Sequence, residues 1–220
     1  MKPTAWSIGR LITNQQSCFE NVMKNFLIFG DSIAYGYGDP KNGWVGRLRE
    51  TMWDKNFVYN LGISGDTTTE VLGRLDFEAK QRIDSDDENV CVFAVGLNDS
   101  IFLIDRGIFQ TELDKFSENI QQISIHAGTF SSQVIFIGLT PVDERKTNPI
   151  SWAPNKVYKN QSIEAYNHAL KSFCDESRLP FIDVLSQWRK EEYIGWLYDG
   201  VHPNAQGHDK LFEQIAPFLT

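Results

Sequence analysis

Residues 26–32 read Phe-Leu-Ile-Phe-Gly-Asp-Ser, a short apolar run that passes directly into a polar turn. Four more apolar runs of similar length, rich in Val, Ile and Phe, occupy residues 57–60, 90–95, 134–137 and 180–184. Short runs of this kind, bounded by turn residues, are typical of buried β-strands. The sequence therefore predicts five short strands, the first of them at residues 26–29.

The segments between these runs have the spacing of amphipathic helices. Residues 109–126 carry Leu113, Phe116, Ile120 and Ile123, which recur at intervals of three and four residues. Similar patterns predict helices over residues 44–53, 67–83, 162–177 and 205–218. Alternating strands and helices form right-handed crossovers, so we expect an α/β fold: a five-stranded parallel sheet inside a three-layer αβα sandwich.

Length and charge restrict the classes of protein that fit. The chain has 220 residues, 41% of them hydrophobic, which is typical of one globular domain. Its formal net charge of −8 gives no indication of a nucleic-acid partner. No stretch approaches the ~20 apolar residues of a transmembrane helix. Three cysteines without metal-type spacing, Cys18, Cys91 and Cys174, favour a reducing, cytoplasmic location.

The first 22 residues differ in character from the rest of the chain. They are polar, as at Asn14, Gln15 and Gln16, and lack the apolar core of a secretory signal. Met23 immediately precedes the first predicted strand. We expect residues 1–22 to be an extension outside the core fold and residues 23–220 to form a single domain.

Polar residues follow the predicted strands at the edge where parallel sheets bind ligands. The blocks are Gly30-Asp31-Ser32, Gly62-Ile63-Ser64-Gly65-Asp66-Thr67 and Gly96-Leu97-Asn98-Asp99, and Asp199-Gly200-Val201-His202 stands before the last helix. Taken singly, each block is an ordinary turn or cap. Together they predict one crevice into which several reactive side chains converge.

These four blocks, in this order, resemble the signature blocks of the SGNH hydrolases, the GDSL family of esterases and lipases. The resemblance extends from about Phe26 to the C-terminus, with Ile33 where Leu is usual. It implies a flavodoxin-like fold and hydrolysis of carboxylic esters through an acyl-enzyme on Ser32, with no cofactor and no metal. It also implies an oxyanion hole built from the backbone N–H groups of Ser32 and Gly65 and the side-chain amide of Asn98.

The residue types support the same chemistry, because a serine needs a base to become a nucleophile. His202 stands in a loop between Asp199 and a proline, where the chain is fixed before a helix. Asp199 lies three residues earlier and can accept the Nδ1 proton, leaving Nε2 for Ser32. We interpret Asp31 as a supporting residue that hydrogen-bonds backbone near the serine.

Other histidines and serines compete for these roles. His126 and His168 fall in predicted amphipathic helices, and His208 is expected to face solvent from the last helix. Ser64 and Ser100 are rival nucleophiles by position, but neither follows the first strand.

The substrate is expected to be a small-molecule acyl ester, with short or single-chain acyl groups favoured because the chain has no large lid insertion. Residues 143–159 are the longest irregular stretch and are predicted to be a loop flanking the site. Phe102 and Trp152 are candidates for the pocket wall. No feature of the sequence predicts an oligomeric state.

Three alternatives remain at this point. An acyltransferase would use the same site with an alcohol as acceptor. A metal-dependent phosphoesterase would bind its metal through residues of the ligand type, which here are Asp31, Asn60, Asn98, Asp99 and His202. The chain lacks the tightly spaced histidines of such sites. A nucleotide-binding module is disfavoured because the glycines at Gly36 and Gly38 lack a phosphate-loop pattern.

Overall fold

The computed structural model describes residues 23–83 and 87–220. Its centre is a parallel sheet in the order β2-β1-β3-β6-β8. The strands are β1 Lys24–Gly30, β2 Phe57–Gly62, β3 Glu88–Ala94, β6 Gln133–Ile137 and β8 Phe181–Ile182. All five predicted strands are present, and their order is that of flavodoxin-like sheets.

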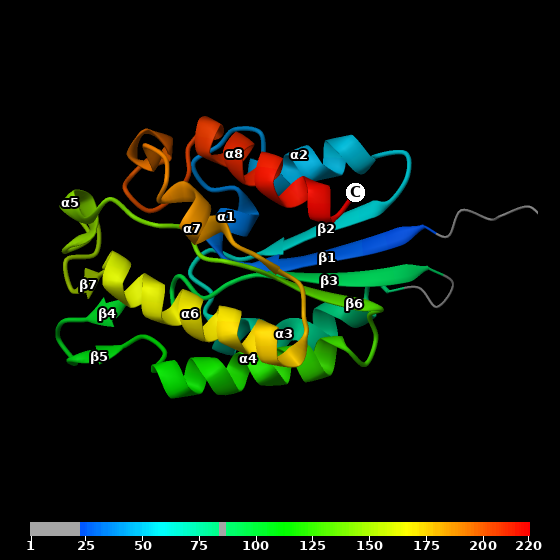
Figure 1. The fold of residues 1–220 in the computed structure, drawn as a ribbon, viewed down its shortest axis with the longest axis horizontal. Helices are drawn as coiled ribbons and strands as arrows, with labels where there is room; N and C mark the ends of the chain where they lie inside the picture. The colour runs from blue at the N-terminus through cyan, green and yellow to red at the C-terminus, as the bar shows by residue number, and fades with distance from the viewer. Residues whose placement is uncertain (1–22, 84–86) are drawn as a thin grey trace, which may run out of the picture.

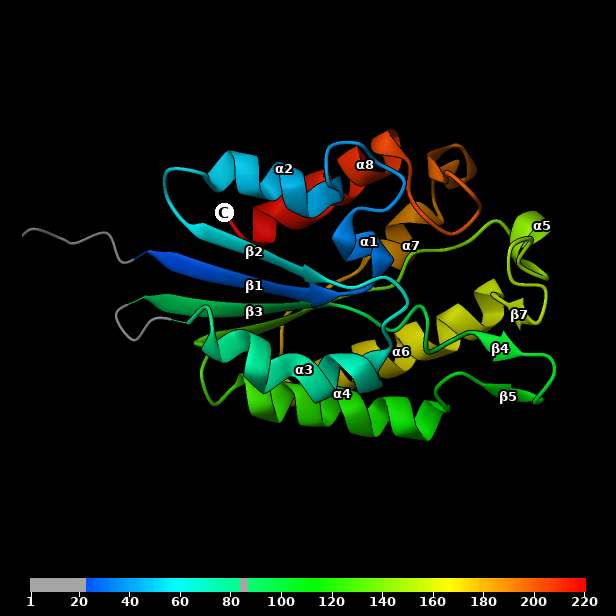
Figure 2. The same cartoon turned by 180° about the vertical axis from the view of Figure 1, so that it is seen from behind.

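Helices cover both faces of this sheet (Figures 1 and 2). One face carries α1 Ser32–Tyr35, α2 Gly43–Met52, α7 Val184–Trp188 and α8 Ala205–Ile215. The other carries α3 Thr68–Lys80, α4 Leu113–Ala127 and α6 Asn160–Ser177. The three-layer αβα sandwich predicted from the sequence is thus confirmed. Short 3₁₀ helices, η1 Tyr193–Trp196 and η2 Ala216–Phe218, flank α8 along the chain.

The register of the sheet aligns the ends of its central strands. Gly30, at the end of β1, lies opposite Gly62 of β2 and Ala94 of β3. A Cβ on Gly62 would lie 2.3 Å from the backbone nitrogen of Tyr35, and one on Gly30 would lie 2.5 Å from Cβ of Ala34. Neither position has room for a side chain, so α1 packs directly onto the ends of β1 and β2.

The core on one side of the central strands contains a row of phenylalanine rings. Phe29, Phe93 and Phe136 come from adjacent strands and are almost fully buried. The centroid of Phe93 lies 5.5 Å from that of Phe29 and 5.3 Å from that of Phe136, with both pairs stacked. Cys91 and Cys174 are also buried, as unpaired thiols.

A second, antiparallel sheet was not predicted. It has the order β5-β4-β7 and consists of β4 Phe102–Leu103, β5 Ile108–Phe109 and β7 Lys156–Val157. The helix expected from residue 109 therefore begins only at Leu113, because Phe109 belongs to β5. The stretch 143–159, expected to be irregular, contains α5 Glu144–Thr147 as well as β7. Two-residue strands are too short to show a periodic pattern, which explains the error.

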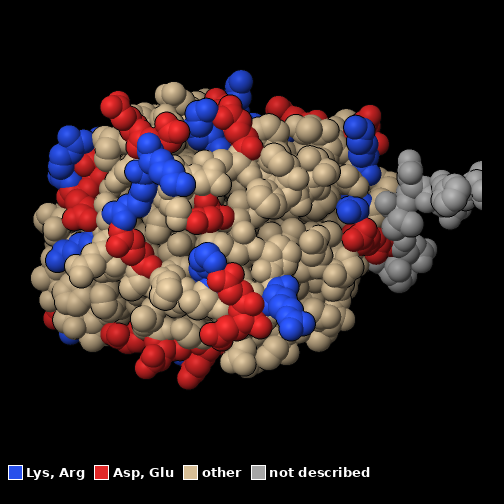
Figure 3. Space-filling model, viewed as in Figure 1, with Lys and Arg blue, Asp and Glu red and all other residues tan. Residues whose placement is uncertain are grey.

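The distribution of charge on the surface and the apolar length of the helices also bear on the expectations from the sequence. Figure 3 shows acidic and basic side chains interspersed over one face of the molecule, without a continuous basic patch on that face. No helix in residues 23–83 and 87–220 is long and apolar enough to cross a membrane. The predicted extension, residues 1–22, lies outside the described residues.

Replacing Phe93 by Ala should lower the free energy of unfolding by about 3–5 kcal/mol, because it opens a cavity beside two stacked rings in the central strand. Urea unfolding followed by circular dichroism measures this loss. Phe77→Ala is the matched control, since Phe77 is 71% exposed and its loss should change stability by less than about 0.5 kcal/mol. Equal effects of the two substitutions would contradict this account of the core.

Candidate active site

Ser32 is placed by the turn that ends β1. It is the first residue of α1, and Asp31 caps that helix by accepting a hydrogen bond of 2.8 Å from the backbone N–H of Ile33. The tight packing of Gly30 against Ala34 and Ala94 fixes the backbone immediately before this cap. Ser32 is 8% exposed, yet it lines a pocket at this edge of the sheet.

Three polar side chains form a continuous chain of short contacts. Oγ of Ser32 lies 2.8 Å from Nε2 of His202, although 170 residues separate them. On the other side of the ring, Nδ1 of His202 lies 2.7 Å from Oδ2 of Asp199. The structure therefore brings Ser32, His202 and Asp199 together in the order that the sequence predicts.

The carboxylate of Asp199 is held by its own turn. Its Oδ1 accepts hydrogen bonds from the backbone N–H groups of Val201 at 3.0 Å and His202 at 2.9 Å. Burial opposes ionisation, but these bonds and the His202 side chain outweigh it, so the pKa of Asp199 lies below its ordinary value. Gly200 lies between Asp199 and His202 in the chain and has φ 102°, a conformation in which glycine is strongly favoured. The turn thus presents an ionised carboxylate to the imidazole.

Gly65 and Asn98, the other expected oxyanion residues, line the same pocket as Ser32. Gly65 has φ 91°, and a Cβ added there would meet nothing within 4 Å. The left-handed backbone therefore favours glycine, and the space beside it is open. Asn98 is 7% exposed, and its side-chain Nδ2 donates a hydrogen bond of 2.9 Å to the carbonyl of Asp66.

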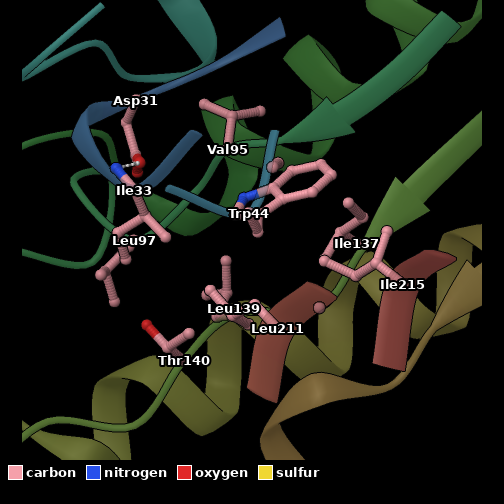
Figure 4. A pocket seen from close by; sticks show the side chains of 12 residues that line it. Asp31, Ile33, Trp44, Val95, Leu97, Ile137, Leu139, Thr140, Leu211 and Ile215 are labelled. Carbon is pink, nitrogen blue, oxygen red and sulfur yellow. Dashed lines mark hydrogen bonds between the residues drawn. The ribbon is translucent and has the colours of Figure 1, made fainter. Parts of the chain in front are cut away.

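Two buried carboxylates stand beside this group. Burial raises the pKa of Asp31 to about 6, and burial likewise raises that of Asp99 to about 6. Figure 4 shows Asp31 at the edge of a small cavity with largely apolar walls, including Val95, Leu97 and Leu139. Asp99 instead accepts hydrogen bonds from the N–H and hydroxyl of Thr68, the first residue of α3. Asp31 thus ties the end of β1 to α1, and Asp99 ties the segment after β3 to the start of α3.

The pocket beside Ser32 has a volume of about 600 Å³. Its exposed rim is aromatic: Tyr37 and Trp152 flank the His202 ring at centroid distances of 4.5 and 6.3 Å, and Tyr198 lies next to Tyr37. Residues in its wall that the sequence reasoning missed are Ile101, Ile150, Ala153, Lys156, Tyr158 and Tyr198. Most of them come from loops or short strands, which carry no periodic signal.

Phe102, which the sequence suggested for the pocket wall, is placed elsewhere. It lies in β4, where its ring packs edge-on against Phe109 at 5.5 Å. It is not among the side chains that line the pocket, whereas Trp152 is.

His208 does not face solvent, contrary to expectation. It is fully buried. Its Nδ1 accepts a hydrogen bond from the N–H of Trp44 at 3.3 Å, and its Nε2 lies 3.2 Å from the carbonyl of Tyr37. Burial lowers its pKa below the ordinary value. Gly43 makes the space for this ring, since a Cβ there would lie 3.0 Å from Cε1 of His208. His208 thus fixes the loop that carries Tyr37.

The remaining rivals lie apart from the contacts of Ser32. His168 is exposed on its helix, whereas His126 is half-buried and lies 3.1 Å from Asp76. Ser100 is buried and donates to the carbonyl of Leu97 at 2.7 Å. Ser64 lines the pocket but is exposed. Of the serines in residues 23–83 and 87–220, only Ser32 has a hydrogen-bond contact to a histidine ring.

Comparison with known proteins agrees with the fold and with these blocks. The model of the GDSL-like Lipase/Acylhydrolase family matches residues 28–210. The chain therefore belongs to this family, as the four sequence blocks suggested, and is by broad class a hydrolase acting on esters.

Individual relatives have low sequence identity to this chain, but they align with most of its length. The isoamyl acetate-hydrolyzing esterase 1 homolog of Mus musculus is 23% identical over 205 residues, which cover 88% of this chain and 80% of that protein. Thioesterase 1/protease 1/lysophospholipase L1 of Escherichia coli (strain K12) is 25% identical over 199 residues, covering 88% and 84%. The crystal structure of a lipase/acylhydrolase from Enterococcus faecalis superposes with a TM-score of 0.70 at 23% identity, covering 90% and 95%.

Replacing Asp199 by Asn should lower kcat for an activated ester by about 10⁴-fold, because an amide neither fixes the imidazole tautomer nor stabilises its charged form. Hydrolysis of p-nitrophenyl acetate measures this effect. Asp105→Asn, at an exposed position, is the control and should leave kcat unchanged. Near-normal turnover by the Asp199 variant would contradict the proposed arrangement.

Replacing Asp31 by Asn should stabilise the protein in a pH-dependent way. The pKa of Asp31 is raised from 3.8 to about 6, so its contribution to stability is full below about pH 4 and is lost as the pH rises through 6. The variant should gain about 2–3 kcal/mol in unfolding free energy at about pH 8, and the gain should vanish near pH 4. Urea unfolding at both pH values measures it, with exposed Asp54→Asn as control. A gain independent of pH would refute this explanation.

Proposed function

We propose that this chain hydrolyses carboxylic esters by a two-step mechanism with Ser32 as the nucleophile. The observation that carries the proposal is the chain of contacts from Ser32 Oγ to His202 Nε2 at 2.8 Å and from His202 Nδ1 to Asp199 at 2.7 Å. A general base must lie within about 2.6–3.2 Å of the proton it removes. Both contacts lie in that range.

In the first step, His202 takes the hydroxyl proton while Ser32 Oγ attacks the carbonyl carbon. The tetrahedral intermediate collapses when the imidazolium donates that proton to the departing alcohol, which leaves an ester on Ser32. In the second step, His202 removes a proton from water as the water oxygen attacks the acyl carbon. The imidazolium then returns that proton to Ser32 Oγ as the bond between Oγ and the acyl carbon breaks and the carboxylic acid leaves. Asp199 remains ionised throughout, which is supported by its lowered pKa, and it stabilises the imidazolium.

The oxyanion of each intermediate needs hydrogen-bond donors. We assign this role to three donors from residues that line the pocket: the backbone N–H groups of Ser32 and Gly65 and the side-chain amide of Asn98. The amide is neutral and so does not repel an incoming ester oxygen. The open space beside Gly65 allows the substrate to approach its backbone closely.

The pocket favours short or single-chain acyl groups. Its volume of about 600 Å³ lies within the range of sites for small molecules. Ile101, Ile150 and Ala153 supply apolar wall, and the rim residues Tyr37 and Trp152 are 46% and 53% exposed. Transfer of the acyl group to an alcohol requires the same Ser32 ester, so product analysis in the presence of an added alcohol separates the two activities.

The phosphoesterase alternative has less support. In the described residues, no group of three or more His, Cys, Asp and Glu side chains is arranged to hold a metal ion. Two of its ligand-type residues are engaged otherwise: Asn60 donates to the carbonyl of Ala34, and Asp99 accepts from Thr68.

The variant Ser32→Ala should lose activity on p-nitrophenyl esters by about 10⁴–10⁶-fold in kcat, because water alone then attacks the bound ester. Ser64→Ala is the matched control: Ser64 lines the same pocket, but among the described serines it is Ser32 that is hydrogen-bonded to His202. It should retain activity within about threefold.

The assay uses esters from acetyl to palmitoyl, with and without EDTA. Wild-type activity should be highest on the short acyl chains and insensitive to the chelator. Retained turnover in Ser32→Ala, or its loss in Ser64→Ala instead, would refute the assignment of the nucleophile. Loss of activity with EDTA would favour the metal-dependent alternative.

A further inference from the structure

Tyr158 is a buried polar residue at the edge of the pocket that the mechanism above does not use. It follows β7 directly and is 5% exposed. Two hydrogen bonds join its backbone to Thr147. The N–H of Tyr158 donates to the carbonyl of Thr147 at 3.0 Å, and the hydroxyl of Thr147 donates to the carbonyl of Tyr158 at 3.1 Å. The ring is therefore held in a fixed position against the site.

The hydroxyl of Tyr158 contacts the amide of Asn98. The distance from its oxygen to Oδ1 of Asn98 is 2.6 Å. Burial, followed by the negative charges of Asp31 and Asp199, raises the pKa of Tyr158 above its ordinary value, so the phenol keeps its proton. A protonated phenol is a donor, and the amide oxygen is the acceptor it faces.

The two ends of the Asn98 amide are thereby assigned. The carbonyl of Asp66 only accepts hydrogen bonds, so the atom 2.9 Å from it must be the amide nitrogen of Asn98. The amide oxygen then faces Tyr158. An amide nitrogen carries two N–H groups, and one of them is used by Asp66. The second N–H remains for the pocket, which Asn98 lines.

We propose that Tyr158 is a positioning residue that holds the Asn98 amide in the orientation in which its second N–H stabilises the oxyanion. The inference rests on the proposed function, because it assumes that an oxyanion forms beside Asn98. Without the phenol, the buried oxygen of Asn98 loses its donor, and the amide is held at the Asp66 end alone. An oxyanion hole depends on donors that are fixed before reaction, so such looseness reduces the rate and not the affinity.

The test is a double-mutant cycle between Tyr158→Phe and Asn98→Ala, measured on p-nitrophenyl acetate. Tyr158→Phe should lower kcat by about 10–100-fold and change KM by less than about threefold, since binding of the ground state does not need the oxyanion donor. Asn98→Ala should lower kcat by about 10²–10³-fold. In the Asn98→Ala background, Tyr158→Phe should have no further effect beyond about twofold, because its target is gone.

Tyr166→Phe is the matched control for loss of a buried hydroxyl. Tyr166 is 2% exposed and donates to the carbonyl of Thr111, in contact with Phe109 and Phe116. It should leave kcat and KM near the wild-type values even where its melting temperature falls. Equal losses of kcat in the two tyrosine variants, or a Tyr158→Phe loss that persists undiminished without Asn98, would overturn the proposal.

A second measurement does not depend on turnover. Side-chain amide hydrogens of Asn98, followed by ¹⁵N NMR, should exchange at least about tenfold faster in Tyr158→Phe than in the wild type or Tyr166→Phe. Unchanged exchange would overturn the role of Tyr158. If the wild type hydrolyses no ester while this exchange still responds, the proposed function fails and the contact between the two side chains stands on its own.

Discussion

Parallel pairing of β1 with both β2 and β3 is the constraint on which the site depends. The register sets Gly30 level with Gly62 and Ala94, so the segments that leave these three strands start from one line. Ser32, Gly65 and Asn98 lie two to four residues beyond that line and therefore reach the same pocket. His202 does not follow a strand of this sheet; it lies in the turn before α8, and its Nε2 contacts Oγ of Ser32.

Two buried carboxylates maintain this arrangement at some cost in stability. Asp31 caps α1 and Asp99 binds the start of α3, and burial raises the pKa of each to about 6. Their charged forms are poorly solvated at neutral pH, which is a local violation of the usual rules for a stable core. Such violations are typical of functional sites, where position matters more than local stability.

The sequence predicted the elements that carry a regular pattern of apolar residues and missed those too short to carry one. Apolar runs and helical spacing identified all five strands of the main sheet. The polar blocks predicted that Ser32, His202 and Asp199 converge, and in the structure these three side chains lie in contact. The β5-β4-β7 sheet was missed because its strands have two residues each. The burial of His208 depends on space left by Gly43, and the contact of Tyr158 with Asn98 joins residues 60 positions apart. Neither leaves a local pattern.

The crowding at Gly30 and Gly62 divides the site into two parts that tolerate change to different degrees. The line of strand ends has no room for a single additional carbon, so its sequence cannot drift without moving Ser32. The aromatic rim formed by Tyr37, Trp152 and Tyr198 is about half exposed. Ester preference can thus diversify at the rim during evolution, or in a designed library, while the reactive centre beneath it is inherited intact.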